Sequence, residues 1–367
     1  MSYGLSIYDL GKSLNISSGW FPMSYKGTMT FQVKYLSSPT ITQEFDIPAG
    51  CLVFVQPAGP AVRHIAYTDS FGTVFSGYVL RTTVSGSLVS ISQELWYGYS
   101  SSPLNNQYVS FNIYAYYPVT SALNDYGILL AGSGVSVALS NTSRLNVVRF
   151  KTALSTSSKE LTVSTGIPAS ETAPSVYISD SGFNAIACYL FQSQGIWHVM
   201  IMRAGGRYYV DFTYTEENPR LGEVKVIAFG DPPQSVPEYG MAFFGNDGGV
   251  AFRSDFMPEM PRGYLSPPSP VVNPPGSAGW HSIGDSNAQM IPDFSTKKPM
   301  IKARLIGISK LSGLPFPVST WLKSNGSLTC GVLRKGQGSL PIGERFGYWG
   351  ENSNNSPIMY IHEDDYF

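Results

Sequence analysis

The side chains that could do acid–base or metal chemistry are few, and their spacing matches no catalytic pattern. The four histidines stand far apart, at His64, His198, His281 and His362. None has a partner at the spacing of a zinc site. Glycoside hydrolysis needs two carboxylates on either side of a sugar, whereas neighbours such as Glu216 and Glu217 point to opposite faces of a strand. The acidic run 362–365 is interpreted as a solvated tail.

Nucleotide-binding and nucleophile motifs are also missing. Gly11-Lys12-Ser13 resembles the end of a P-loop, but the glycine required at position 6 is Ser6. No serine has glycines two residues before and two after it. The cysteines Cys51, Cys188 and Cys330 lie too far apart for a CxxC site and are expected to be small buried residues. We therefore predict a protein that is not an enzyme, with no catalytic residue, no metal and no cofactor.

Aromatic clusters are the remaining candidates for a binding site. Trp96, Tyr97 and Tyr99 stand where a strand enters a loop, and Tyr348 and Trp349 stand at the matching place near the C-terminus. Exposed aromatic side chains on loops can stack on sugars or anchor a protein interface. The alternative is that these positions pack into a repeated core.

The elements that must position these residues are strands. Runs such as 111–116 and 223–229 alternate large apolar residues with smaller or polar ones, and Val224 and Val226 share one face. Clusters of Gly, Pro, Asn and Ser separate such runs, as in hairpins. With 37 Gly, 26 Pro and 13% aromatic residues, the composition predicts a folded, turn-rich, all-β protein.

A threefold internal repeat is the most informative pattern. Tyr3, Tyr126 and Tyr239 stand 123 and 113 residues apart. Each opens a Tyr-Gly-apolar sequence that continues as a short strand, a glycine turn and a second strand ending in serine, which predicts a β-hairpin. The unit ends also match: an aromatic strand end, a polar loop and a final alternating strand, such as Phe111–Tyr116 or Val224–Phe229.

We therefore predict three tandem, mutually similar antiparallel β-sandwich-like domains, at 1–120, 121–235 and 236–367. The third unit carries seven prolines near 257–280. Proline at this density cannot pair as a central strand. We interpret the segment as a surface loop inserted after the third hairpin, either a partner contact or a stiff variable loop.

Charge and hydropathy exclude several classes of partner. The net charge is −1, with 24 basic and 25 acidic residues and no basic stripe, so nucleic acid is not an expected partner. No run of about 18 apolar residues exists, so no membrane insertion is expected. The N-terminus lacks the pattern of a signal peptide, which predicts synthesis in a cytoplasm.

The opening Met1-Ser-Tyr-Gly-Leu-Ser-Ile-Tyr-Asp-Leu-Gly resembles a family of tailed-bacteriophage proteins encoded among tail-tip and tail-fibre genes. The resemblance covers about 17 residues, recurs in part at Tyr126 and Tyr239, and carries no catalytic motif. It implies a virion structural role in the distal tail, with other phage tail proteins as partners and a host receptor or glycan as a further contact.

We therefore expect a protein of the phage tail, made in the host cytoplasm, that acts in assembly and in host adhesion. Three similar domains in one chain could imitate a trimer on a threefold axis; a homo-oligomer of the whole chain is the competing arrangement. The alternative function is a carbohydrate-binding or carbohydrate-degrading β-rich surface protein, which needs aromatics and carboxylates on one face. The low charged fraction, 13%, favours a surface covered by other proteins.

Overall fold

The structure is a computed structural model of the 367-residue chain. It describes residues 4–9, 12–17, 23–35, 37, 39–47, 51–59, 61–70, 72–116, 127–132, 135–140, 145–205, 218–235, 238, 240–244, 247–266, 271–272, 283–284, 288–303, 305–311, 314–332 and 358–367. This part of the chain consists of strands and their connections, with one short 3-10 helix, η1 (Glu363–Asp365), and no α-helix. The all-β prediction is confirmed.

The first unit begins with a hairpin of β1 (Gly4–Asp9) and β2 (Lys12–Ser17). Seven strands follow: β3 (Met23–Gln32), β4 (Thr40–Glu44), β5 (Leu52–Pro57), β6 (Val62–Asp69), β7 (Gly72–Ser85), β8 (Leu88–Tyr97) and β9 (Tyr108–Tyr116). They form two antiparallel sheets, in the orders β3-β9-β5 and β4-β8-β7-β6.

The second unit has the hairpin β10 (Gly127–Gly132) and β11 (Val135–Ser140). Its further strands are β12 (Val147–Thr156), β13 (Glu160–Pro168), β14 (Ser175–Asp180), β15 (Ala185–Ser193), β16 (Ile196–Ala204) and β17 (Gly222–Gly230). They pair as β12-β17-β14 and β13-β16-β15.

The third unit has the hairpin β18 (Ala242–Phe244) and β19 (Val250–Arg253), and a minor strand pair of β21 (Val271–Val272) and β22 (Ile283–Gly284). Its sandwich strands are β20 (Gly263–Leu265), β23 (Gln289–Met290), β24 (Pro299–Ile301), β25 (Leu305–Leu311), β26 (Leu314–Leu322), β27 (Ser327–Val332) and β28 (Ile358–His362). They pair as β20-β28-β24 and β23-β27-β26-β25.

One strand order is shared by all three units. In what we call the inner sheet, the last strand lies between the first and the third; in the outer sheet, the next-to-last strand pairs with the second. Local detail repeats too. The first strands carry a β-bulge at Tyr25/Gly27 and at Val148/Phe150, and the first two hairpins pair Gly4 with Ser17 and Gly127 with Ser140. Each of these positions recurs at an offset of 123 residues, so the repeat predicted from sequence is a repeat of structure.

The second and third units are joined through their sheets. Ile178 of β14 pairs with Ile301 of β24, which extends the inner sheet to six strands, and Ile186 of β15 pairs with Thr320 of β26 in the outer sheet. One continuous core then fills the space between the two sheets and contains side chains of both units. The prediction of three tandem domains is therefore not confirmed, although the unit order along the chain is as expected.

The inner sheets of all three units meet in a second core, here called the central cluster. Each unit contributes large side chains from its third and last strands. These are Phe54 and Tyr114 from the first unit, Tyr177, Ile227 and Phe229 from the second, and Met300, Met359 and Ile361 from the third. The first unit keeps a further core of its own between its two sheets. Since a strand's alternate side chains face opposite sides, the inner strands β14, β24 and β28 are buried on both faces and read as apolar runs.

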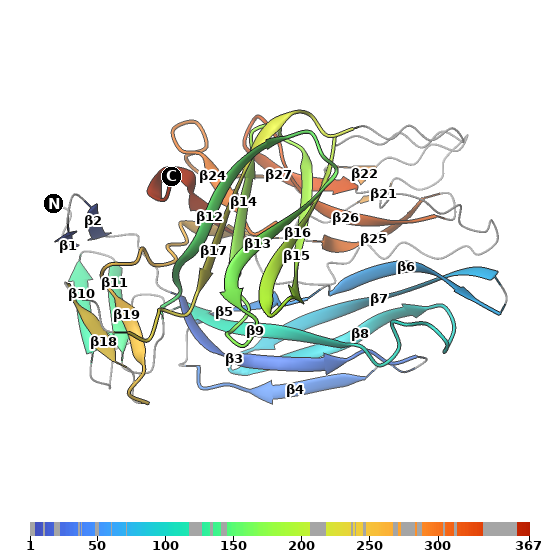
Figure 1. Cartoon of the computed structure of the whole chain (residues 1–367), viewed down its shortest axis with the longest axis horizontal. Helices are drawn as coiled ribbons and strands as arrows, with labels where there is room; N and C mark the ends of the chain where they lie inside the picture. Colours follow the sequence, from blue (N-terminus) through green and yellow to red (C-terminus); the bar gives the residue numbers. More distant parts are fainter. Residues whose placement is uncertain are drawn as a thin grey trace.

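The three hairpins gather at one end of the long axis of the molecule (Figure 1). The β1–β2 and β10–β11 hairpins lie next to each other. The third hairpin packs onto the central cluster through Phe252, which is 2% exposed, and the partly buried Phe243. The chain therefore places three copies of one element on one face.

The proline-rich segment is only partly a loop. Within it, Gly263–Leu265 forms β20, an edge strand of the inner sheet, and Pro258 and Pro261 are buried. An edge strand can lie beside prolines because one side of its backbone needs no ladder partner. The interpretation of 257–280 as a surface loop is corrected for this stretch. The prolines from 267 to 275 lie outside the described residues.

Candidate functional site

The predicted aromatic site in the first unit is split between core and surface. Trp96 is partly buried against the first unit's own core and meets Tyr35 edge-on, with ring centroids 6.0 Å apart. Tyr99 is 52% exposed. Tyr97 is the last residue of β8, and the structure describes only its backbone. Of this cluster, Tyr99 has the most exposed of the described side chains.

The loop that carries Tyr99, residues 98–107, is held by the preceding loop at the end of β3. The backbone N–H of Asn106 donates to the carbonyl of Val33 (2.8 Å), and the N–H of Tyr35 donates to the Asn105 side-chain oxygen (3.0 Å). Tyr108, 68% exposed, stands at the far end of the loop. The loop thus has a defined shape and presents two tyrosines.

Tyr348 and Trp349 lie outside the described residues. In the chain they fall between β27 and β28, the connection that corresponds to loop 98–107 of the first unit. The matching of the two clusters by position is therefore supported by the strand order. Their role in binding stays a prediction.

A buried polar group that sequence patterns do not reveal lies inside the central cluster. Glu259, 3% exposed, accepts hydrogen bonds at Oε1 from the hydroxyls of Ser175 (2.6 Å) and Tyr177 (2.8 Å). The Nζ of Lys302 lies 3.1 Å from the same oxygen, and Nδ2 of Asn146 donates to Oε2 (2.9 Å). A buried carboxylate needs such a full set of donors to offset its lost hydration.

Aromatic rings enclose this group. The Lys302 ammonium stands over the rings of Tyr177 and Tyr114, 5.0 and 5.4 Å from their centroids. Burial, and next the charge of Glu259, raise the pKa of both tyrosines well above the ordinary value. Both hydroxyls therefore stay protonated at neutral pH and act as hydrogen-bond donors. Ser175, Glu259 and Lys302 come from distant parts of the chain, and no local spacing could have predicted their meeting.

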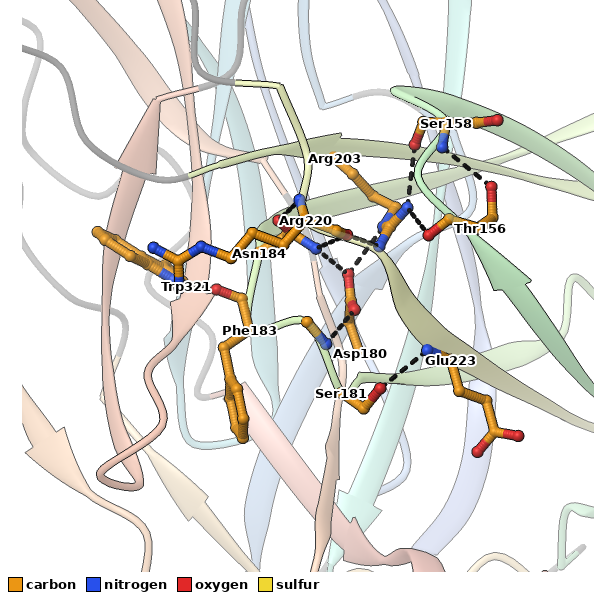
Figure 2. Close-up of polar contacts among 11 residues, drawn as sticks. Thr156, Ser158, Asp180, Ser181, Phe183, Asn184, Arg203, Arg220, Glu223 and Trp321 are labelled. Carbon is orange, nitrogen blue, oxygen red and sulfur yellow. Dashed lines mark hydrogen bonds and ion pairs between the residues drawn. The ribbon is translucent and has the colours of Figure 1, made fainter.

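A second buried ion pair ties together the strand ends of the second unit (Figure 2). Nε of Arg203 donates to Oδ2 of Asp180 (2.7 Å), and both side chains are at most 1% exposed. The remaining guanidinium nitrogens donate to the carbonyls of Thr156, Ser158 and Arg220, each at 3.1 Å. This arrangement joins the ends of β12, β14 and β16 to the start of β17.

The same carboxylate of Asp180 also shapes the adjoining turn. Its Oδ1 accepts from the backbone N–H of Gly182 (2.8 Å) and its Oδ2 from Nδ2 of Asn184 (2.9 Å). The Asn184 side chain in turn holds the backbone of Arg220 through both its oxygen and its nitrogen. With its oxygens directed at these donors, Asp180 is a structural acid.

The acidic C-terminal run is not a solvated tail, and that interpretation is corrected. Glu363 is 8% exposed, and its carboxylate accepts from Nζ of Lys225 (2.6 Å) and from the hydroxyl of Ser179 (2.9 Å). Tyr366, 7% exposed, lies in the central cluster and donates its hydroxyl to the carbonyl of Pro258. The C-terminal turn therefore closes the central cluster.

None of these arrangements has the geometry of a hydrolytic or metal centre. Asp180, Glu259 and Glu363 are each surrounded by donors that fix them. Across the described ranges, no group of three or more His, Cys, Asp or Glu residues could hold a metal ion. No helix in that part of the chain is long and apolar enough to span a membrane.

Comparison with protein-family models, with curated proteins and with solved structures found no match to this chain.

Proposed function

We propose that this protein is a non-enzymatic structural component of the distal tail of a tailed bacteriophage. One observation carries the structural role: a single chain builds three units of one strand order and delivers their three hairpins to the same end (Figure 1). The sequence resemblance at the N-terminus, which lies in the first of these hairpins, supplies the assignment to a phage tail.

Repetition within one chain suits a position on a symmetry axis. Three similar faces in one molecule can meet three equivalent sites of a cyclic partner, while the differences between units still mark one direction. We propose that the chain occupies such an axis as a pseudo-threefold monomer. A symmetric homo-oligomer of the whole chain is the competing arrangement, and the molecular mass in solution distinguishes the two.

Adhesion to a host surface is the second part of the proposal. β3 leads from the hairpin side of the first unit to the loops that carry Tyr35 and Tyr99 (Figure 1). A molecule anchored by its hairpins would then present this aromatic loop to a receptor or glycan, with the partly buried Trp96 supporting it.

The test of the tail assignment is electron microscopy of virions labelled with a gold-conjugated antibody against this protein. Label at the distal tip of the tail is expected. Label elsewhere, or virions that lack the protein, would overturn the proposal. A virion carrying Tyr99→Ala, compared with one carrying Tyr264→Ala at another half-exposed tyrosine, tests adhesion separately.

A further inference from the structure

Three side chains in the central cluster carry the chemical groups that an amide-forming reaction needs. Lys302 offers a primary amine, Asn146 a carboxamide, and Glu259 a carboxylate that contacts both. The Lys302 Nζ lies 3.1 Å from Oε1, and the Asn146 amide nitrogen lies 2.9 Å from Oε2. One carboxylate can therefore exchange protons with the attacking amine and with the leaving nitrogen.

We propose that Lys302 and Asn146 become joined by an intramolecular amide bond, with Glu259 as the catalytic acid and base. Glu259 takes a proton from the Lys302 ammonium, and the neutral Nζ attacks Cγ of Asn146. The Nζ–Cγ bond forms and the Cγ–Nδ2 bond breaks as Glu259 returns the proton to the departing nitrogen, which leaves as ammonia. The second proton that Nζ loses on becoming an amide nitrogen passes through the same carboxylate to the ammonia. An ammonium and a carboxamide thus give a secondary amide and an ammonium ion, so no oxidant or cofactor is needed.

The surroundings favour this reaction over hydrolysis of the amide. Asn146 is 5% exposed and Glu259 3%, and the Lys302 side chain is 13% exposed. The rings of Tyr114 and Tyr177 line the position of the amine. Exclusion of water strengthens the polar interactions that move the proton and removes the competing nucleophile. Fixing the groups side by side raises their effective concentration.

Asn146 supplies the acyl group, because its carboxamide nitrogen donates to Glu259. Gln56 accepts a hydrogen bond from Lys302 Nζ at 3.1 Å, but its amide nitrogen is directed at the carbonyl of Pro174 (3.1 Å). Without contact to Glu259, Gln56 has no described group placed to protonate its leaving nitrogen.

The bond would connect the second unit to the third. Asn146 lies immediately before β12, and Lys302 immediately after β24. The two residues are 156 positions apart, so the bond closes a large covalent loop through the central cluster. Such a loop restricts the unfolded chain and keeps the units associated even after their sheets separate.

The experiment is a mass measurement on the full-length protein, purified and then denatured. The wild-type chain is expected to be lighter than its sequence mass by about 17 Da, one ammonia per molecule. Digestion with trypsin is expected to give one branched peptide that joins residues 145–149 to residues 298–304. Lys302 stays uncleaved within it because its amine is acylated.

Two variants serve as tests. Lys302→Arg keeps the positive charge beside Glu259 and cannot form the amide, and Glu259→Gln removes the proton carrier. Both are expected to show the full sequence mass and no branched peptide, with circular dichroism confirming a folded chain. If Glu259→Gln fails to fold, Lys302→Arg still decides. Lys225→Arg is the matched control, because the partners found for Lys225, such as Glu363, are not carboxamides, and it should keep the mass deficit.

A folded wild-type protein that keeps its full sequence mass after long incubation would overturn the proposal. So would a mass deficit that persists in Lys302→Arg, which would instead indicate cyclisation of an asparagine. A branch mapped to Gln56 would overturn the assignment to Asn146. None of these outcomes depends on the role of the protein in a phage tail.

Discussion

At the scale of single residues, the buried charges of this chain come in pairs that are hydrogen-bonded on several sides. Arg203 with Asp180 and Lys302 with Glu259 both lie inside the protein. Removing one member of such a pair leaves the other charge without compensation in a medium of low dielectric constant. The loss of stability caused by such a substitution should therefore increase with the burial of the partner that remains.

We expect Arg203→Met to lower the free energy of unfolding by about 3–5 kcal/mol, since Asp180 would be left as a buried unpaired carboxylate. Urea unfolding followed by circular dichroism measures the loss. Lys297→Met is the control, because Lys297 and its partner Asp364 are almost half exposed and such pairs contribute about 0–1 kcal/mol. Equal effects of the two substitutions would contradict the structural role of Asp180.

The pH dependence of stability has an assignable contribution from His362. Burial lowers the pKa of this imidazole below its ordinary value of 6.5, and the nearby Arg262 and Lys297 act in the same direction, against Asp365 and Asp293. The unfolded chain therefore takes up a proton near pH 6.5 that the folded chain takes up only at lower pH. Stability is then lost as the pH falls below that value.

His362→Gln removes the titrating group, so the loss of stability between about pH 7.5 and about pH 5.5 should be smaller than in the wild type. Chemical denaturation at the two pH values, compared between wild type and variant, gives the difference. A variant whose loss equals that of the wild type would show that other groups account for the dependence.

At this scale the buried acids were the features least predictable from the sequence. The run at 362–365 looks like an exposed tail because its charges are adjacent, yet Glu363 turns inward to Lys225. Glu259 gave no signal, because its partners come from strands that meet only when three units pack together.

At the scale of elements, the hairpins were the most predictable feature. The glycine turn and the period-2 alternation fix the register locally, so β1–β2 and β10–β11 pair as expected. The third hairpin differs by a bulge between Phe243 and Phe244, next to its longer turn. Isolated two-stranded hairpins are only marginally stable in water, so each needs a surface to pack on.

For the third hairpin that surface is the central cluster. We expect Phe252→Ala to cost about 3–5 kcal/mol, because a ring that is 2% exposed and packs against Phe243 would leave a cavity. Phe244→Ala, in the same hairpin but 49% exposed, should change stability by about 0.5 kcal/mol or less. Thermal unfolding of the two variants tests whether this hairpin is docked; similar effects would show that it is not.

At the scale of the whole molecule, the second and third units share two sheets and one core. The sequence predicts their strands, but not which edges meet, because an edge strand carries the same alternation whether it is free or paired. The seam rests on few residue pairs, among them Ile178 with Ile301 and Ile186 with Thr320. Continuity of the core across the seam is what joins the units.

Ile178 and Ile301 lie opposite each other across this seam, and each is at most 2% exposed. The test substitutions are Ile178→Ala and Ile301→Ala. Each should lower stability by about 2–5 kcal/mol. Because the core is shared, both should shift the same calorimetric transition. Two separate transitions, each sensitive to only one of the substitutions, would show that the units unfold independently.

The pairing of first and last strands decides how each unit would respond to tension along the chain. In the second unit Val147, where the chain enters the sandwich, pairs with Gly230, where it leaves. A pull applied at these two points loads the hydrogen bonds of the ladder one pair at a time, starting from this end, instead of shearing all of them at once. Asn146 directly precedes Val147, which belongs to the first pair of this ladder. A covalent bond from this residue to Lys302 would carry tension along the chain directly to Lys302, so the segment 147–301, which contains both this ladder and β24, would bear no load.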